Sequence, residues 1–236
     1  MAEPKVNPTD ALPAASREYG AIGETSAVPR WGMVVDQERC LGCWSCAVIC
    51  KSENDIPLGM WWNRILTEGA AIDTPATNAG RQEMHWLPLA CQHCDNAPCV
   101  KVCPVQATYR RADGVVMMDN ERCIGCRYCM IACPYGVRVF NWGKPDRPNA
   151  LETGMVPARP IGTVEKCLLC VHRLTDGQVP SCVWSCPAGA RIFGDLNDPN
   201  SRVSTVVRER EASQLLADRG TQPKVMYVAP RRRRPL

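Results

Sequence analysis

Sixteen cysteines dominate the chemistry that this 236-residue chain could perform, and they fall into four groups of four. Each group opens with the spacing C-x2-C and closes with C-x3-C, and only the middle gap differs, at two, four, two and eleven residues. Such dense, regular thiols indicate either disulfides or metal binding. In chain order, groups one to four are Cys40, Cys43, Cys46 and Cys50; Cys91, Cys94, Cys99 and Cys103; Cys123, Cys126, Cys129 and Cys133; and Cys167, Cys170, Cys182 and Cys186.

Disulfides and zinc fit this pattern poorly. Disulfides favour small secreted domains, cysteines three apart in a tight loop are badly placed to pair, and the N-terminus lacks the basic start and apolar region of a signal peptide. Structural zinc sites usually combine two C-x2-C knuckles, whereas groups one and three place a third thiol three residues on. Iron–sulfur binding is the interpretation that accounts for all four groups.

The spacing also predicts how the clusters share their ligands. A C-x2-C-x2-C loop can hold three corners of a 4Fe–4S cube, and in the bacterial ferredoxin run C-x2-C-x2-C-x3-C-P the fourth cysteine serves the other cluster. Prolines 104, 134 and 187 complete that run in groups two to four, whereas Lys51 follows Cys50. The ferredoxin rule pairs group two with group three, and elimination pairs group one with group four.

Four complete sets of ligands predict four 4Fe–4S clusters and no 3Fe–4S centre. We name the predicted ligand sets quartets A to D: Cys40, Cys43, Cys46 and Cys186 (A); Cys167, Cys170, Cys182 and Cys50 (B); Cys91, Cys94, Cys99 and Cys133 (C); and Cys123, Cys126, Cys129 and Cys103 (D).

Composition and charge narrow the class of protein. The chain is 45% hydrophobic and 22% charged, yet it has only two Phe, so the cysteines must help to define the fold. Without Arg231 to Arg234, 24 basic residues balance 24 acidic ones, which argues against a broad nucleic-acid surface. No apolar stretch approaches the roughly 18 residues of a membrane helix. We therefore expect a cytoplasmic chain, or one that reaches a membrane or is exported only through its partners.

The elements that must position the thiols are short. Apolar runs predict strands over 31–36, 84–90, 114–119, 136–140, 191–196 and 224–228, with a helical turn over 47–54. Residues 56–83 have no simple period, and residues 143–163 form a proline-rich connection. The spacing of the valines and leucines over 198–220 predicts one amphipathic helix that ends at Gly220. Strand, cysteine loop, short helix and strand together indicate an α+β ferredoxin plan.

The order of the four groups resembles that of a known family. With local runs such as "CQHCDNAPCVKVCP" (91–104), "CIGCRYCMIACPYGV" (123–137) and "EKCLLCVHRL" (165–174), residues 31–228 are similar to the iron–sulfur subunit of molybdopterin oxidoreductases. That family includes dimethyl sulfoxide, polysulfide, thiosulfate, tetrathionate and arsenate reductases and sulfite dehydrogenase. The cluster motifs are specific for the family but not for the substrate.

The resemblance implies two fused ferredoxin-like units, each with two clusters, and strengthens the pairing of group one with group four. The expected organisation is an extended N-terminal arm (1–30), a first unit (31–83 and 141–197) into which a second unit (84–140) is inserted, and a C-terminal helix with a basic tail (198–236). The arm and the arginine tail are not part of the family pattern.

The function implied is electron transfer, with no catalysis by this chain alone. Its partners would be a large catalytic subunit that carries molybdenum or tungsten bis-pterin, and a membrane subunit that handles quinone. Two alternatives remain. A free-standing soluble polyferredoxin would need an acidic docking surface, and a cluster- or zinc-stabilised nucleic-acid-binding protein would need a basic stripe through its body.

Other residues that could do chemistry have simpler explanations. The sixteen thiols complete the ligand sets, so His85, His93 and His172 are expected to be ordinary core or surface residues, although two of them lie near cysteine loops. The tryptophans are expected to shield clusters or to anchor interfaces. The cations next to the cysteines either offset the charge of reduced clusters or belong to the solvated surface; they are Lys101, Arg127, Arg138 and Lys166.

Overall fold

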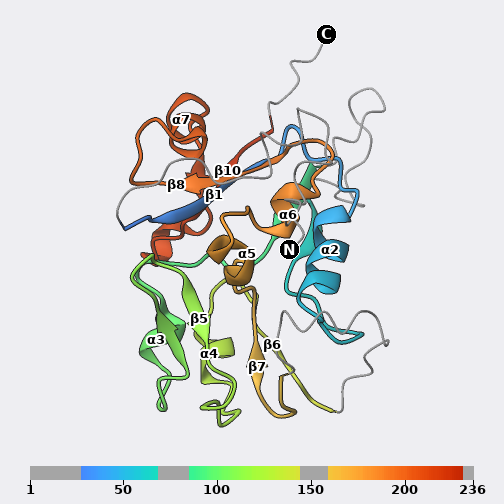
Figure 1. The fold of residues 1–236 in the computed structure, drawn as a ribbon, viewed down its shortest axis with the longest axis vertical. Helices are drawn as coiled ribbons and strands as arrows, with labels where there is room; N and C mark the ends of the chain where they lie inside the picture. The colour runs from blue at the N-terminus through green and yellow to red at the C-terminus, as the bar shows by residue number, and fades with distance from the viewer. Residues whose placement is uncertain (1–27, 69–84, 144–158, 231–236) are drawn as a thin grey trace, which may run out of the picture.

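The computed structural model describes residues 28–68, 85–143 and 159–230, which contain all sixteen cysteines (Figure 1). Within these residues the fold is a mixture of short helices and strands, in agreement with the expected α+β class. Most of the expected N-terminal arm, most of the proline-rich connection and the four-arginine tail lie outside the described residues.

A four-stranded sheet organises one end of the molecule (Figure 1). Its order is β8 (Arg191–Asp195), β1 (Trp31–Asp36), β10 (Val225–Val228) and β9 (Ser213–Gln214). Strand β1 is antiparallel to β8 and parallel to β10. The first strand of the chain is thus paired on both sides with strands from the C-terminal part.

Both faces of β1 are buried, because its apolar run has no polar alternation. Met33 and Val35 point into the core that also contains Cys46 and Cys182, whereas Val34 points to the opposite face, where it packs with Val203. This is the two-residue period of a strand. The inner face of the sheet therefore forms one wall of the cysteine region.

Helix α7 (Arg202–Glu209) covers the outer face of the sheet, and it corrects the prediction of a single helix over 198–220. It begins with an N-cap in which the Ser201 side chain accepts a hydrogen bond from the Ser204 amide, a common start signal. The backbone turns left-handed at Glu211, with φ of 48°, and the chain continues as β9 and a short 3-10 helix (Ala217–Arg219). Ala212 and Leu215, which belong to the same apolar pattern, pack from the segment after the helix, whereas Leu216 is exposed.

Three two-stranded ladders complete the strand structure: β2 (Arg64–Glu68) with β3 (His85–Leu89), β4 (Thr108–Arg110) with β5 (Val116–Met118), and β6 (Val139–Phe140) with β7 (Val164–Glu165). Strand β2 lies in a segment for which the sequence predicted no element. The ladders β2–β3 and β6–β7 each join a strand of one expected unit to a strand of the other, so the two units are tied together.

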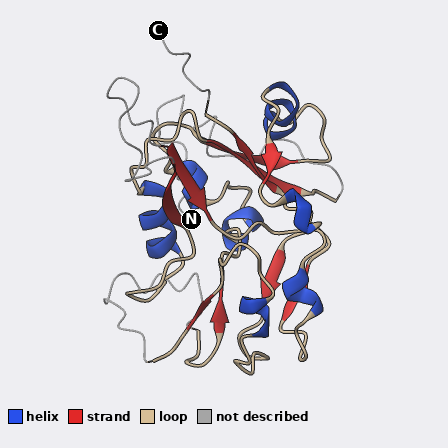
Figure 2. Ribbon diagram, turned by 180° about the vertical axis from the view of Figure 1, so that it is seen from behind, coloured by secondary structure: helices blue, strands red, loops and turns tan. Residues whose placement is uncertain are grey.

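Short helices follow the cysteine loops: α2 (Ser45–Glu53), α3 (Pro98–Lys101), α4 (Tyr128–Ile131), α5 (Val171–Thr175) and α6 (Ser181–Trp184). Seen from behind in Figure 2, the four-stranded sheet lies toward one end of the molecule, and the β4–β5 and β6–β7 ladders lie toward the other. Among the described residues, no helix is long and apolar enough to cross a membrane.

Candidate metal centres

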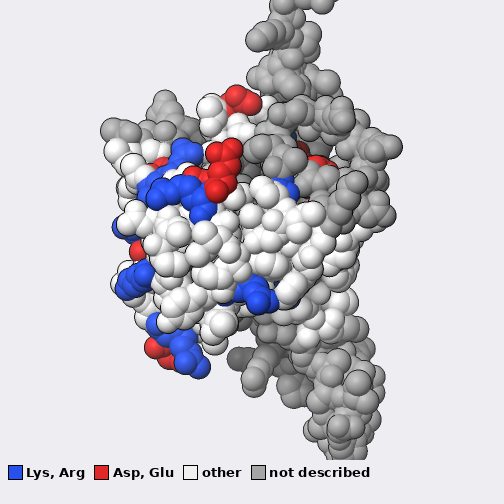
Figure 3. All heavy atoms as spheres, turned by 90° about the horizontal axis from the view of Figure 1, so that it is seen from below, with Lys and Arg blue, Asp and Glu red and all other residues white. Residues whose placement is uncertain are grey.

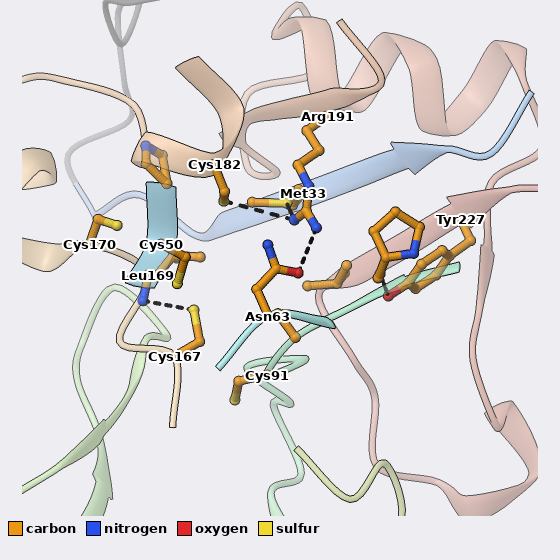
Figure 4. A pocket seen from close by; sticks show the side chains of 14 residues that line it. Met33, Cys50, Asn63, Cys91, Cys167, Leu169, Cys170, Cys182, Arg191 and Tyr227 are labelled. Atoms are coloured by element: carbon orange, nitrogen blue, oxygen red, sulfur yellow. Dashed lines mark hydrogen bonds between the residues drawn. The ribbon is translucent and has the colours of Figure 1, made fainter. Parts of the chain in front are cut away.

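Three of the four predicted quartets each line one cavity. All four cysteines of quartet A lie around the first, together with Arg191, Pro88 and Pro187. The four of quartet B surround the second, shown in Figure 4, where their thiols approach from different segments of the chain. The four of quartet C surround the third, with Pro134 and Arg138. Each cavity combines three thiols from one or two neighbouring loops with one from a distant group.

Quartet D lies nearer the surface. Its Cys126 is exposed, Cys103 and Cys123 are half-buried, and Cys129 is buried. Burial raises the pKa of the Cys129 thiol, and the charges of Cys123 and Cys103 raise it further. Since that effect needs proximity, Cys103 of group two lies near Cys129 of group three.

The cavities follow one another in a row. Arg191 and Pro88 line both the quartet A cavity and the quartet B cavity. Cys91, a member of quartet C, also lines the cavity of quartet B. Arg138 lines the cavity of quartet C and acts electrostatically on Cys129 of quartet D. The spatial order is therefore A, B, C, D.

The same local backbone shape recurs in all four groups. Two residues after the first cysteine, the chain has a positive φ, at Gly42, His93, Gly125 and Leu169. The turn directs amides at sulfur: Gly125 N–H donates to Cys123 Sγ over 3.4 Å, and Leu169 N–H donates to Cys167 Sγ over 3.3 Å. Two of these positions lack glycine, so the surrounding structure must hold a conformation that side chains disfavour.

Burial makes these thiols reluctant to ionise on their own. It raises the pKa of Cys94 to about 12, and the charge of Cys91 adds to this effect. It likewise raises the pKa of Cys182 to about 12, against the opposing influence of Arg191. Four such thiols around one dry cavity need a strongly cationic group to become thiolates together, and coordinated iron supplies that charge.

The geometry favours a large inorganic group over a single ion or a disulfide. All sixteen cysteines are free thiols. Across the described ranges, no three His, Cys, Asp or Glu side chains lie close enough to hold one metal ion, although four thiols face each of three cavities. Nη2 of Arg138, on the wall of the quartet C cavity, is buried and has no hydrogen-bond partner among residues 28–68, 85–143 and 159–230. An inorganic sulfide would provide the missing acceptor.

The structure buries three cations near the thiols, of which the sequence had singled out two. The sequence singled out four, of which Lys166 and Arg138 are buried and Lys101 and Arg127 are exposed. It missed Arg191, whose Nη1 lies 3.8 Å from Cys182 Sγ and whose Nη2 donates to Asn63 Oδ1 over 2.9 Å (Figure 4). The only available signal was its place shortly after the C-P pair of group four.

His93 and His172 interact with other protein groups near the cysteine loops. Burial holds the pKa of His93 well below its usual value, and its Nδ1 accepts a hydrogen bond from the Val116 amide over 3.1 Å. A neutral imidazole that accepts at Nδ1 carries its proton on Nε2. His172 instead pairs with Glu53 at 2.8 Å, at the junction of α5 and α2.

Comparison with known proteins agrees with this geometry. Residues 82–147 and 156–196 match the family model described as a 4Fe-4S dicluster domain, which includes groups two, three and four. The chain is 54% identical, over 84% of its length and 78% of the relative's, to a protein of Halobacterium salinarum named as an iron-sulfur subunit of dimethyl sulfoxide reductase.

Two further relatives cover similar shares of the chain. A subunit of tetrathionate reductase from Salmonella typhimurium is 42% identical over 87% of this chain and 74% of its own. The iron-sulfur cluster-binding subunit of menaquinone reductase from Nitratidesulfovibrio vulgaris is 38% identical over 86% of this chain and 89% of its own. From its cysteine cavities and these relatives, the chain belongs to the 4Fe-4S dicluster family of iron–sulfur electron-transfer subunits found in complexes of the dimethyl sulfoxide reductase type.

Proposed function

We propose that each quartet holds one 4Fe–4S cluster, so that the chain carries four of them in the order A, B, C, D. The ligands would be the four cysteines that define each quartet. A 4Fe–4S cluster takes up and releases one electron at a time. The observation that carries the proposal is that each site lies next to the following one. Arg191 lines cavities A and B, Cys91 lines cavities B and C, and Arg138 lines cavity C and acts on Cys129 of quartet D.

The chain itself would hold the sites in line, exclude water and set the charge around each. Cavities B and C are lined almost wholly by buried side chains such as Leu169, Tyr227 and Val137. Quartets A and D each include an exposed cysteine, Cys43 and Cys126. Electrons would therefore enter and leave at the two ends of the row.

The expected two-unit organisation, with residues 84–140 inserted between 31–83 and 141–197, remains part of this proposal. The β1–β8 ladder supports it, since it joins the strand before group one to the strand after group four. The β4–β5 hairpin between groups two and three plays the corresponding local part in the inserted unit.

The proposed partners are a catalytic subunit with molybdenum or tungsten bis-pterin at one end and a quinone-linked membrane subunit at the other. The names of the relatives, subunits of reductases that include a menaquinone reductase, support this. Exposed apolar side chains surround both ends: Leu41, Trp44 and Val48 near quartet A, and Ile124, Tyr128 and Ile131 near quartet D. Figure 3 shows the end with α4 and the β6–β7 hairpin, where uncharged surface fills most of the middle.

The test is metal analysis of the complex that the full-length chain forms when it is purified without oxygen. We expect about sixteen irons per chain, four for each cluster, together with about one molybdenum or tungsten in a large co-purifying subunit. Iron at this level without molybdenum, tungsten or a large partner would instead indicate a free-standing polyferredoxin. Zinc in place of iron would refute both.

A further inference from the structure

Three buried cations stand at the three junctions between successive quartets. Arg191, Lys166 and Arg138 are 3%, 0% and 5% exposed. Across the part of the chain that the structure describes, none of the three forms an ion pair with an aspartate or glutamate, although other buried cations, such as Arg159 with Glu165, do. A buried cation without a counter-charge is costly, so a negatively charged group bound beside each of the three would stabilise it.

Arg191 occupies the junction of quartets A and B. Its guanidinium lines both cavities and lies 3.8 Å from Cys182 Sγ of quartet B (Figure 4). Burial alone would lower the pKa of Arg191, but the charges of Cys182 and of Cys46, which belongs to quartet A, raise it. Nη2 donates to Asn63 Oδ1 over 2.9 Å, which fixes the orientation of the guanidinium between the two sites.

Lys166 occupies the junction of quartets B and C. Its Nζ donates to the carbonyl of Val116, on β5 beside quartet C, and over 2.9 Å to that of Cys167, a member of quartet B. Burial lowers the pKa of Lys166, and the charges of Cys91 and Cys167, which come from these same two quartets, oppose that shift. Two backbone anchors therefore hold one ammonium within reach of both.

Arg138 occupies the junction of quartets C and D. It lines the cavity of quartet C, and the thiols that act on its charge are Cys99 and Cys91 of that quartet and Cys129 of quartet D. Nη1 donates to Thr108 Oγ1 over 3.1 Å, while Nη2 is buried and finds no hydrogen-bond partner within the described residues. One arm of the guanidinium is thus held by β4, and the other could donate to a bound cluster or to one of its thiolates.

We propose that Arg191, Lys166 and Arg138 each stabilise the added electron on both clusters that flank them. Each cation would thereby raise the reduction potentials of two adjacent clusters: A and B, B and C, and C and D, respectively. This inference rests on the proposed function, because it needs a cluster in each quartet. Four thiolates leave an iron–sulfur cluster with net negative charge, and reduction makes that charge larger. A fixed cation in a dry site opposes the increase much more strongly than an exposed one does. Losing the cation must therefore make both neighbouring clusters harder to reduce.

The test is a redox titration of the anaerobically purified complex, followed by electron paramagnetic resonance, with chemical mediators as the electron source. In Arg191→Met, we expect the potentials of the clusters in A and B to fall by at least about 59 mV, a tenfold change in a one-electron equilibrium, while C and D stay unchanged. In Arg138→Met, the clusters in C and D shift and the other two do not. In Lys166→Met, the clusters in B and C shift.

Two controls separate charge from structure. Arg191→Lys keeps the charge, so both potentials should return most of the way to those of the parent. Arg122→Met removes an exposed cation next to Cys123, and solvent screening should leave all four potentials in place. Unchanged potentials in Arg191→Met, or an equal fall of all four, would overturn the inference.

Iron content keeps the outcomes distinct. Sixteen irons and four signals with unmoved potentials would leave the proposed function intact and reject the role of the cations. Fewer clusters in the unmodified complex would reject the proposed function itself. If Arg191→Met does not assemble, the Arg138 and Lys166 variants still test the pairwise pattern.

Discussion

Gly125 shows how closely single residues constrain a cysteine loop. Its φ is +70°, and a Cβ added there would lie 2.2 Å from the carbonyl oxygen of Gly162. Since that atom belongs to backbone, it cannot swing aside as the end of a flexible side chain could. The loop of quartet D is therefore held against the β6–β7 region at a point where only a hydrogen atom fits.

Replacing Gly125 with alanine should destabilise this loop more than the left-handed backbone alone requires. That conformation costs a non-glycine residue about 1 kcal/mol, and the contact with Gly162 adds to the cost. We expect a loss of stability above that value and selective loss of the cluster in quartet D, measured by thermal unfolding and by iron content of the purified complex.

Gly177 provides the matched control, because its φ is +69° and an added Cβ would meet nothing within 4 Å. Gly177→Ala should cost only about 1 kcal/mol and leave the iron content unchanged. If the two variants behave alike, the close approach to Gly162 does not shape the quartet D loop.

Residue types and spacing predicted the groups of thiols, but only part of the buried charge around them. The groups were readable because ligand spacing is local. Arg191 was not, because its sequence neighbours indicate only a strand, and its burial arises from the distant partners β1 and Asn63. Long-range packing decides which cations are buried, and no local pattern records it.

At the scale of elements, the cross-sharing of cysteines between loops can be tested directly. Cys133 belongs to group three by sequence but lines the cavity of quartet C with Cys94 of group two. Cys133→Ser and Cys94→Ser should therefore perturb the same cluster signal in electron paramagnetic resonance. Cys103→Ser should instead resemble Cys126→Ser, with an effect on the cluster of quartet D. Each serine variant removes a soft thiolate ligand that iron–sulfur clusters prefer.

The opposite grouping would disprove the assignment. If each cluster took its ligands from one sequence group alone, Cys133→Ser would resemble Cys126→Ser, and Cys103→Ser would resemble Cys94→Ser. Total iron should fall by about four per chain in either case, so only the identity of the lost signal decides between the two arrangements.

The strands of the main sheet were predictable, whereas the helix at the C-terminal end was only partly so. The apolar run 31–36 gave β1 with its exact bounds, and 224–228 contains β10. The period over 198–220 predicted one helix as far as Gly220, but the helix stops at Glu209. Ala212 still packs on the same core after a left-handed turn, and Ser213 pairs with Tyr227. Strand pairing with β10 outweighed local helical spacing.

At the scale of the whole molecule, the surfaces beside quartets A and D should tolerate an added charge less well than the rest of the surface does. Ile131, at the quartet D end, is 82% exposed, and exposed apolar groups of this kind commonly mark interfaces. Ile131→Glu and Leu41→Glu should each weaken the hold of one partner subunit or reduce electron flow through the complex at least about tenfold, a cost near 1.4 kcal/mol. Subunit recovery and turnover with artificial donors and acceptors measure both.

Leu216→Glu serves as the control, since Leu216 is also exposed but lies outside both cysteine loops. It should leave assembly and turnover as they are. All three variants should retain parental iron content and cluster potentials. Normal assembly and turnover in both Ile131→Glu and Leu41→Glu would show that the ends are not the partner contacts.

The position of β1 between β8 and β10 has a consequence for biosynthesis. Quartets C and D are built from residues 91–133, which leave the ribosome together. Quartet A instead waits for Cys186, and the sheet that flanks it waits for β10, which ends at Val228. During synthesis, the first cysteines to emerge would therefore be among the last to be enclosed, and their thiols would stay open to oxygen and stray metal until β10 has been made.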